Sequence, residues 1–241
     1  MATRYGLPLS LRNLRVALAE AGRPPRVVLD IPTLDLAAGV QLAICGPSGS
    51  GKTTLLNILA AIQRPDSGRV RWGDTDVDAL TATGADRWRR ESLGFVFQEF
   101  HLIAGMSASE NVLLPLRFDH LSINAAMRHA ATTLLDRIGV PPKVSIERLS
   151  RGEMQRVAIA RALIRAPAIV LADEPTASLD RRTAGTVAEL LCRLCRDRGT
   201  TLVVVTHDDA LADRLDRRVL LSVDAAAASN GTAVTPELSS A

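Results

Sequence analysis

Short, unbroken apolar runs alternate along this chain with segments whose apolar residues recur every three or four positions. The runs at residues 40–45, 168–172 and 201–206 are rich in β-branched residues and are typical of parallel strands buried on both faces. Residues 183–195 have helical spacing and lie between the last two runs, which predicts a β-α-β crossover. The pattern therefore indicates an α/β fold around a parallel sheet.

The middle of the chain follows a different pattern. From about residue 98 to residue 165 the periodicity is mostly helical, with helices expected at 124–138 and 153–164. We therefore expect one domain over residues 7–224, with a helical subdomain inserted at about 98–165. Residues 225–241 lose apolar periodicity and are predicted to be a disordered tail.

Composition and charge argue against several classes of function. The net charge is +3, and no basic stretch with interleaved aromatic residues occurs, so no nucleic-acid partner is expected. Cys192 and Cys195 form an isolated C-x-x-C within a predicted helix, where two small buried residues are a better interpretation than a redox or metal site. The first residues do not resemble a signal peptide, and no apolar run is long enough to span a bilayer. Any work at a membrane would therefore need a partner.

A glycine-rich turn follows the first apolar run. Residues 46–53 read GPSGSGKT, after a predicted strand and before a helix expected from Lys52 to about Ile62. This is the pattern of a phosphate-binding P-loop, in which backbone N–H groups and the helix N-terminus surround phosphate oxygens. Lys52 would reach the β- and γ-phosphates, and Thr53 would bind Mg²⁺. The predicted ATP-binding residues are Gly46, Pro47, Ser48, Gly49, Ser50, Gly51, Lys52, Thr53 and Thr54.

Two acids end the second apolar run. Asp173 follows directly after the strand and would hold Mg²⁺ through water, and Glu174 is the next residue. Glu174 is therefore placed to polarise an attacking water as the general base.

With these residues, the chain resembles the ATP-binding cassette (ABC) ATPase family. Residues 149–153 read LSRGE, which is similar to the family signature LSGGQ, and they lead into a helix. The resemblance implies a P-loop NTPase (RecA-like) core, the inserted helical signature subdomain and an N-terminal antiparallel β region. It also implies a dimer, expected to consist of two identical chains, in which Ser150, Gly152 and Glu153 contact the ATP bound by the other subunit.

Other family positions occur in the expected order. Gln98 resembles the glutamine that senses Mg²⁺ and the γ-phosphate, and Asp180 lies in a segment similar to the D-loop that communicates across the dimer. His207 resembles the histidine that bonds the γ-phosphate and steadies the attacking water. The resemblance thus assigns catalytic roles to Glu174, His207 and Gln98, and metal roles to Thr53, Gln98 and Asp173.

The chain departs from the family pattern at three places, of which Glu153, where glutamine is frequent, is a common variant. Arg151 stands where glycine is usual, so its side chain is expected to point away from the nucleotide. The aromatic residue that stacks on adenine should fall near Ala17 or Leu18, and neither is aromatic. We therefore expect weaker base stacking and weaker discrimination between ATP and GTP.

Residues 93–116 are similar to the lipoprotein-releasing and macrolide-exporter type of cassette. This likeness implies an ATPase located in the cytoplasm, on the inner face of the cell membrane, that drives an integral membrane permease. A regulatory cassette of the cell-division type, which binds a membrane partner without moving substrate, is the first alternative, and a soluble cassette acting on ribosomes or DNA is the second. Five residues after the predicted strand either face the permease or pack the helical subdomain: Phe97, Phe100, His101, Leu102 and Ile103. The sequence does not name the cargo.

Overall fold

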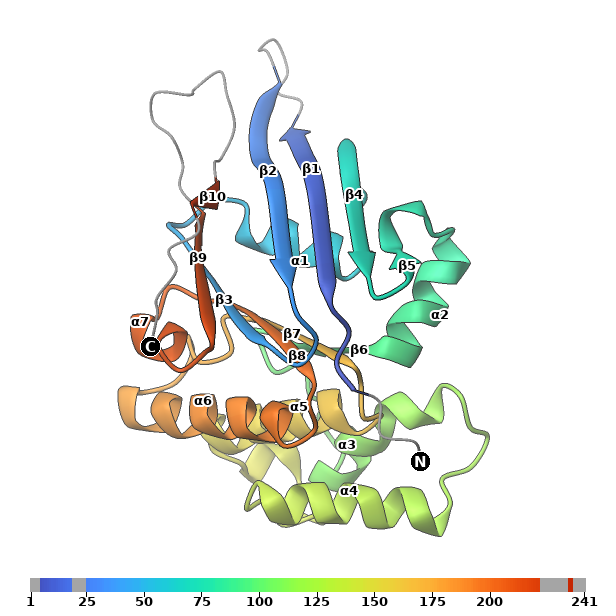
Figure 1. Ribbon diagram of the computed structural model, residues 1–241. Helices are drawn as coiled ribbons and strands as arrows, with labels where there is room; N and C mark the ends of the chain where they lie inside the picture. The colour runs from blue at the N-terminus through green and yellow to red at the C-terminus, as the bar shows by residue number, and fades with distance from the viewer. Residues whose placement is uncertain (1–4, 19–24, 222–233, 236–241) are drawn as a thin grey trace.

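The computed structural model describes residues 5–18, 25–221 and 234–235. Its strands form two sheets, one above the other in Figure 1. The first is antiparallel, in the order β2-β1-β4-β5. The second has the order β10-β9-β3-β8-β7-β6 and is parallel except for the β9–β10 pair. The strands are β1 Leu9–Leu18, β2 Arg26–Leu36, β3 Gln41–Cys45, β4 Ser67–Trp72, β5 Thr75–Asp76, β6 Leu93–Val96, β7 Ile169–Asp173, β8 Thr201–Val205, β9 Arg217–Leu221 and β10 Val234–Thr235.

The three apolar runs of the sequence form adjacent central strands. Strands β3 and β8 are buried at every position, and β7 is buried up to Asp173. Apolar residues are therefore required on both faces, which is why these strands lack alternation. The predicted α/β fold with an N-terminal antiparallel region is confirmed.

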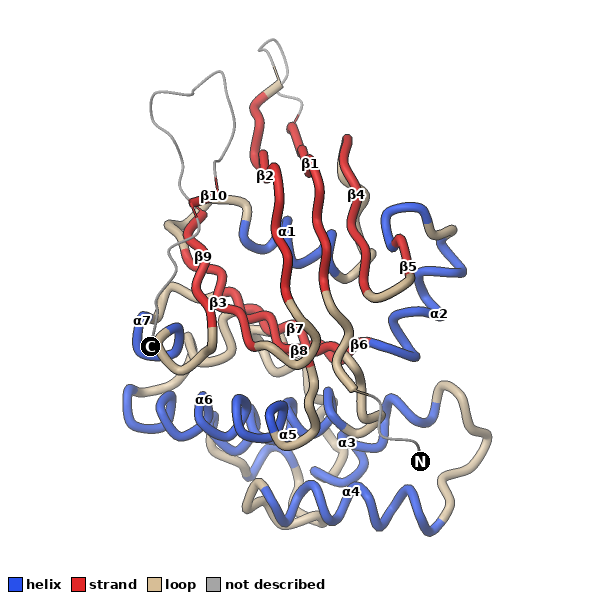
Figure 2. The backbone as a smooth tube through the Cα atoms, in the orientation of Figure 1, coloured by secondary structure: helices blue, strands red, loops and turns tan. Residues whose placement is uncertain are grey.

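Seven α-helices and two short 3₁₀ turns are present among the described residues (Figure 2). The helix after the P-loop ends at Leu59 and not near Ile62, as the sequence suggested. Ala60 is its C-cap and Ala61 has φ 53°, a left-handed conformation that cannot continue the helix. The helices are α1 Lys52–Leu59, α2 Ala82–Ser92, α3 Ala108–Arg117, α4 Ala125–Arg137, α5 Arg151–Leu163, α6 Arg181–Arg196 and α7 Asp209–Ala212, with 3₁₀ turns at Val77–Ala79 and Ile146–Arg148.

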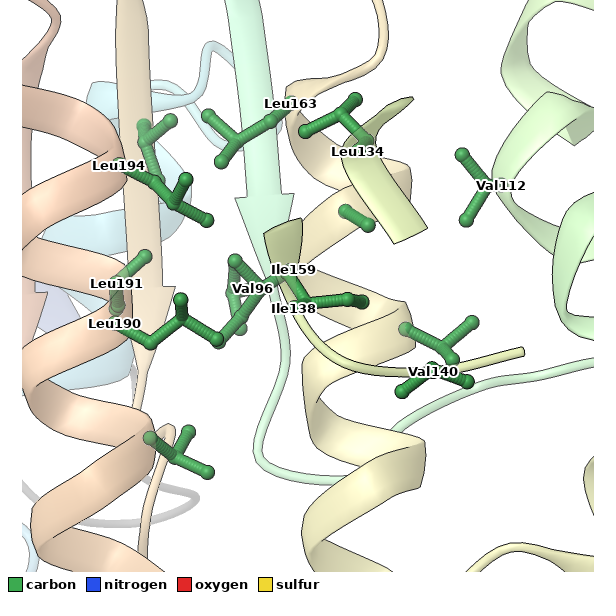
Figure 3. Close-up of a cluster of buried hydrophobic side chains, with 14 of the residues drawn as sticks. Val96, Val112, Leu134, Ile138, Val140, Ile159, Leu163, Leu190, Leu191 and Leu194 are labelled. Carbon is green, nitrogen blue, oxygen red and sulfur yellow. The ribbon is translucent and has the colours of Figure 1, made fainter. Parts of the chain in front are cut away.

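Helices α3, α4 and α5 lie between β6 and β7 in the chain. Their apolar faces share one core with α6 and with one face of the parallel sheet, as Figure 3 shows for Val112, Leu134, Ile159 and Leu191. A second core joins α1 to the antiparallel sheet and to the opposite face of the parallel sheet. Helices α1 and α5 therefore pack on opposite faces of the same sheet.

Three smaller expectations can be compared with the structure. All three cysteines are buried, and burial raises the pKa of the Cys192 and Cys195 thiols, as befits packing residues. No helix within the described residues is long and apolar enough to cross a membrane. Of the predicted tail, residues 234–235 form β10, which pairs with β9, and the rest lies outside the described residues.

Candidate functional site

The turn between β3 and α1 depends on glycine at three positions. Gly46, Gly49 and Gly51 have φ of 154°, 79° and 87°, a region that residues with a side chain rarely adopt. A Cβ on Gly46 would lie 2.5 Å from the backbone oxygen of Leu221, and one on Gly51 would lie 2.7 Å from Leu29 Cδ2. The loop conformation is thus available only to the sequence found there.

The N-terminus of α1 is left open by this turn. Gly51 is the N-cap and offers no side-chain hydrogen bond to the first turn. Among the described residues, the buried Ser50 Oγ finds no hydrogen-bond partner. Lys52 Nζ donates to the backbone oxygens of Gly46 and Pro47 at 2.7 and 2.9 Å, so its charge lies across the mouth of the loop. Free backbone donors, a free hydroxyl and an ammonium group are together suited to binding phosphate.

A carboxylate faces the first turn of α1 from the end of β7. Thr53 Oγ1 donates to Asp173 Oδ2 at 3.2 Å. Burial raises the pKa of the Asp173 carboxyl, the Thr53 hydrogen bond lowers it, and the nearby Glu174 charge raises it. A hydroxyl and a carboxylate at this spacing are oxygen ligands that suit Mg²⁺.

Glu174 is held in a strained and well-fixed position. Its φ is 45°, and its N–H donates to the backbone oxygen of Val205 at 2.9 Å. Its Oε1 lies 2.7 Å from His207 Nδ1, and its Oε2 accepts from Thr206 Oγ1 and from the His207 N–H, both at 3.3 Å. The Glu174 side chain is 13% exposed and that of His207 is 68% exposed. A left-handed glutamate costs about 1–3 kcal/mol and persists where neighbours fix it, as at functional sites.

One cavity of about 470 Å³ brings most of the predicted residues together. P-loop residues, Gln98, Asp173 and Glu174 line it. Leu18, Arg26 and Val28 of the antiparallel sheet also line it, and of these the sequence pattern pointed only to Leu18. Leu18 and Arg26 are register partners of β1 and β2, so the missing signal was the pairing across the hairpin. The full lining is Leu18, Arg26, Val28, Ser48, Gly49, Gly51, Lys52, Thr53, Thr54, Gln98, Asp173 and Glu174.

The signature residues begin α5 and do not line this cavity. Ser150 Oγ accepts from the Glu153 N–H at 3.3 Å, and Glu153 Oε2 accepts from the Ser150 N–H at 2.8 Å and hydroxyl at 2.6 Å. This capping box lowers the pKa of the Glu153 carboxyl, first through the Ser150 hydroxyl and then through its N–H.

Packing between α5 and α6 explains why residue 152 is glycine, and the sequence did not show this. A Cβ at this position would lie 2.4 Å from Thr183 Cγ2 on α6. The glycine therefore lets α5 and α6 approach each other, in addition to the predicted approach to a ligand.

The D-loop residue Asp180 caps α6. Its carboxylate accepts from the N–H groups of Arg182 and Thr183, each at 3.1 Å. A hydrogen bond with the Thr183 side chain lowers the pKa of the Asp180 carboxyl most, and the two backbone N–H bonds lower it further. Asp180 thus fixes the start of α6 directly after residues 175–179, which follow Glu174.

Comparison with known proteins agrees with this geometry. Residues 29–177 match the family model described as ABC transporter. The chain is 43% identical, over 92% of its length and 97% of the relative's, to "Lipoprotein-releasing system ATP-binding protein LolD 1" of Rhodopirellula baltica. It is 45% identical to the protein of the same name from Rhodopseudomonas palustris, over 77% of this chain and 83% of the relative.

Solved structures of similar fold include a dimeric post-hydrolysis state of the ATP-binding cassette MJ0796 bound to ADP and Pi. That structure has a TM-score of 0.78 and 36% identity, and it covers 90% of this chain and 96% of its own. A P-loop with an adjacent acid pair defines a nucleoside triphosphatase by its chemistry. The chain belongs to the ABC transporter family, as an ATP-binding subunit that hydrolyses ATP.

Proposed function

We propose that this chain is the ATP-hydrolysing subunit of a transporter of the lipoprotein-releasing type, with a magnesium ion at Thr53 and Asp173. The observation that carries the hydrolytic part is the Glu174–His207 contact of 2.7 Å at the edge of the P-loop cavity. The transport class is supported by the names of the relatives. A lipoprotein is the cargo this predicts.

The residues in and around the P-loop cavity divide the work as follows, with His207 outside the cavity lining and in contact with Glu174. The open first turn of α1 and Lys52 bind the phosphates, and Ser50 Oγ is available to them. Mg²⁺ would neutralise phosphate charge there, with Thr53, Asp173 and Gln98 in reach of it from the cavity wall. Glu174 accepts a proton from water, and His207 holds the Glu174 carboxylate in place while its other ring nitrogen is left for the γ-phosphate.

Two chains are needed to complete the site. Ser150, Gly152 and Glu153 do not line the cavity formed by the P-loop of their own chain. Because α1 and α5 pack on opposite faces of the parallel sheet, we infer that the signature acts on ATP held by a second cassette. The dimeric cassette structures at 36% identity support this arrangement.

The end of the cavity that would receive the base has an aliphatic and cationic lining. Among the described residues that form it, none is aromatic. We infer that the base lies against Leu18 and Val28, with the Arg26 guanidinium over its face, since guanidinium groups stack on planar π systems. Replacing Leu18→Tyr should raise ATP affinity about tenfold by adding a stacking ring. Titration calorimetry with ATP, GTP and tripolyphosphate would check this, and equal gains for tripolyphosphate would contradict it.

The hydrolytic role has a direct test in Glu174→Gln. The amide keeps the size of the side chain but cannot accept a proton, so ATP should bind while hydrolysis falls by at least about a hundredfold. The variant should then accumulate as an ATP-bound dimer on size-exclusion chromatography, whereas Lys52→Ala should stay monomeric. Normal turnover by Glu174→Gln would remove Glu174 from the role of base.

A groove of about 610 Å³ next to β6 offers a surface for the membrane partner. It is lined by Phe97, which is 37% exposed, by Phe118, which is 74% exposed, and by Arg90. His101 also lines the groove, and Ile103 is 44% exposed, whereas Leu102 packs against the helical core. Leu102 therefore packs the helical subdomain, whereas Phe97, His101 and Ile103 remain candidates for contact with the permease. We infer that an apolar segment with acidic residues, from the permease, docks here.

Co-isolation from membranes tests the partner. The tagged chain should recover a membrane permease, and Phe97→Asp should lose it, because a carboxylate would be buried against apolar surface. Ile62→Asp is the matched control, since Ile62 is 56% exposed and does not line the groove. Recovery of ribosomes or DNA in place of a permease would overturn the proposed class.

A further inference from the structure

Arg151 replaces the first glycine of the usual signature, and its side chain joins three segments. It projects from the first turn of α5. Its Nε donates to the backbone oxygen of Ser178, in the D-loop, at 2.9 Å. Its guanidinium carbon lies 5.6 Å from the centre of the Phe100 ring, a distance at which cation–π attraction operates. Glycine at this position could make neither contact.

The other two segments are themselves firmly held. Arg161, near the end of α5, donates to the backbone oxygens of Phe100 (2.7 Å) and His101. Gln155, fully buried on α5, donates to the backbone oxygen of Pro175 at 2.7 Å. The turn at Phe100 and the loop after Glu174 are thus both fixed to α5, and Arg151 contacts each of the two, the loop through a hydrogen bond and the turn through a cation–π contact.

We propose that Arg151 is a positioning residue that fixes the D-loop to the Phe100 turn through the start of α5. The Ser178 carbonyl lies four residues after Glu174 and two before Asp180, so its position bears on both. The Phe100 turn continues into His101, which lines the groove beside β6. Displacement of this turn is therefore transmitted to the D-loop backbone through one guanidinium group.

Loss of the side chain should loosen the D-loop without unfolding the protein. Arg151→Met keeps a long side chain but removes the charge and the donor, and Arg151→Lys keeps a charge and a donor. Arg148→Met is the matched control, because Arg148 is exposed, lies three residues earlier, and its side chain has no hydrogen bond or ion pair within the described residues.

The mobility of the D-loop backbone can be measured with a spin label placed next to Ser178. The native cysteines are all buried, so a nitroxide on Ala177→Cys, an exposed position next to Ser178, would label that site selectively. In nucleotide-free protein, Arg151→Met should increase the mobile fraction of the label about severalfold, since one charge-assisted hydrogen bond is lost. Arg151→Lys should restore part of the ordering, and Arg148→Met should leave the spectrum unchanged.

Kinetics provide a second arm, which rests on the proposed two-cassette function. With the D-loop displaced, kcat for ATP should fall about five- to tenfold while KM changes less than twofold. Phe100→Leu should lower kcat less, and the double variant should be no worse than Arg151→Met alone. Thermal unfolding of each variant excludes global destabilisation as the cause.

The two experiments test the role of Arg151 and the proposed function separately. Unchanged label mobility in Arg151→Met overturns the proposal, and so does a raised KM with unchanged kcat, which would place Arg151 against nucleotide. A parent chain without ATPase activity would contradict the proposed function, yet the mobility measurement would still decide the role of Arg151.

Discussion

Two helix N-termini are assigned to phosphate in this protein, and they are built in opposite ways. Helix α1 begins at a left-handed glycine with no side-chain cap, and the adjacent Ser50 hydroxyl has no partner among the described residues. Helix α5 begins at Ser150, whose hydroxyl and N–H are both bonded to Glu153. The first is ready to bind an anion, whereas the second uses its capping hydroxyl internally and places a carboxylate beside it.

This difference indicates an order of events. Phosphate can bind the backbone N–H groups at the start of α1 without breaking a side-chain cap, because Gly51 makes none. An anion that is to bind the Ser150 hydroxyl of α5 must release it from Glu153, and it meets the Glu153 carboxylate beside that hydroxyl. We infer that nucleotide binds the P-loop first and that the partner's signature engages second, when dimer closure supplies the free energy.

The largest effect is expected on ATP affinity, at the uncapped N-terminus of α1. Lys52→Ala removes the ammonium group that now contacts the Gly46 and Pro47 oxygens, and a charged contact to phosphate is lost with it. ATP affinity should fall by about 3 kcal/mol, or roughly a hundredfold. Calorimetry measures this, with circular dichroism as the control for folding. Retained binding would show that backbone donors alone suffice at α1.

A smaller effect, on the free energy of unfolding, is expected from adding one methyl group in the first turn of α5. Gly152→Ala would place Cβ 2.4 Å from Thr183 Cγ2, and overpacking of this kind costs about 1–3 kcal/mol. The free energy of unfolding in urea should fall accordingly. Thr183→Ser removes Cγ2 and keeps the hydroxyl, so the double variant should recover most of the loss. Failure to recover would mean that Gly152 is required for its backbone and not for this contact.

The smallest effect on the free energy of unfolding is expected at Ser150, the N-cap of α5. Ser150→Ala should lower the free energy of unfolding by about 1 kcal/mol, as for other N-caps. Ser50→Ala at the open end is the matched control and should change it by less than about 0.5 kcal/mol, because the Ser50 hydroxyl has no partner to lose.

The cap should also show a pH dependence. The folded pKa of Glu153 is lowered from 4.5, so its stabilisation is present above about pH 4.5 and is lost as pH falls through the folded value. The difference between the parent and Ser150→Ala should therefore narrow below that pH. An equal difference at all pH values would contradict a role for the Glu153 charge in the cap.

The sequence by itself determined the parallel core, the P-loop, the acid pair and the helical insertion, because each depends on local pattern. The short β-branched run at 201–206 favours a buried strand, and the glycines of GPSGSGKT favour a phosphate-binding turn. The helix end at Leu59 was missed because a left-handed alanine follows no strong local rule.

Only the tertiary structure decided what meets across elements. The cavity wall formed by Leu18, Arg26 and Val28 depends on hairpin register and on a second sheet lying over α1. The need for Gly152 comes from Thr183 on another helix, and the place of Arg151 comes from a carbonyl 27 residues away. Contacts of this kind depend on side-chain packing between distant segments, which periodicity does not encode.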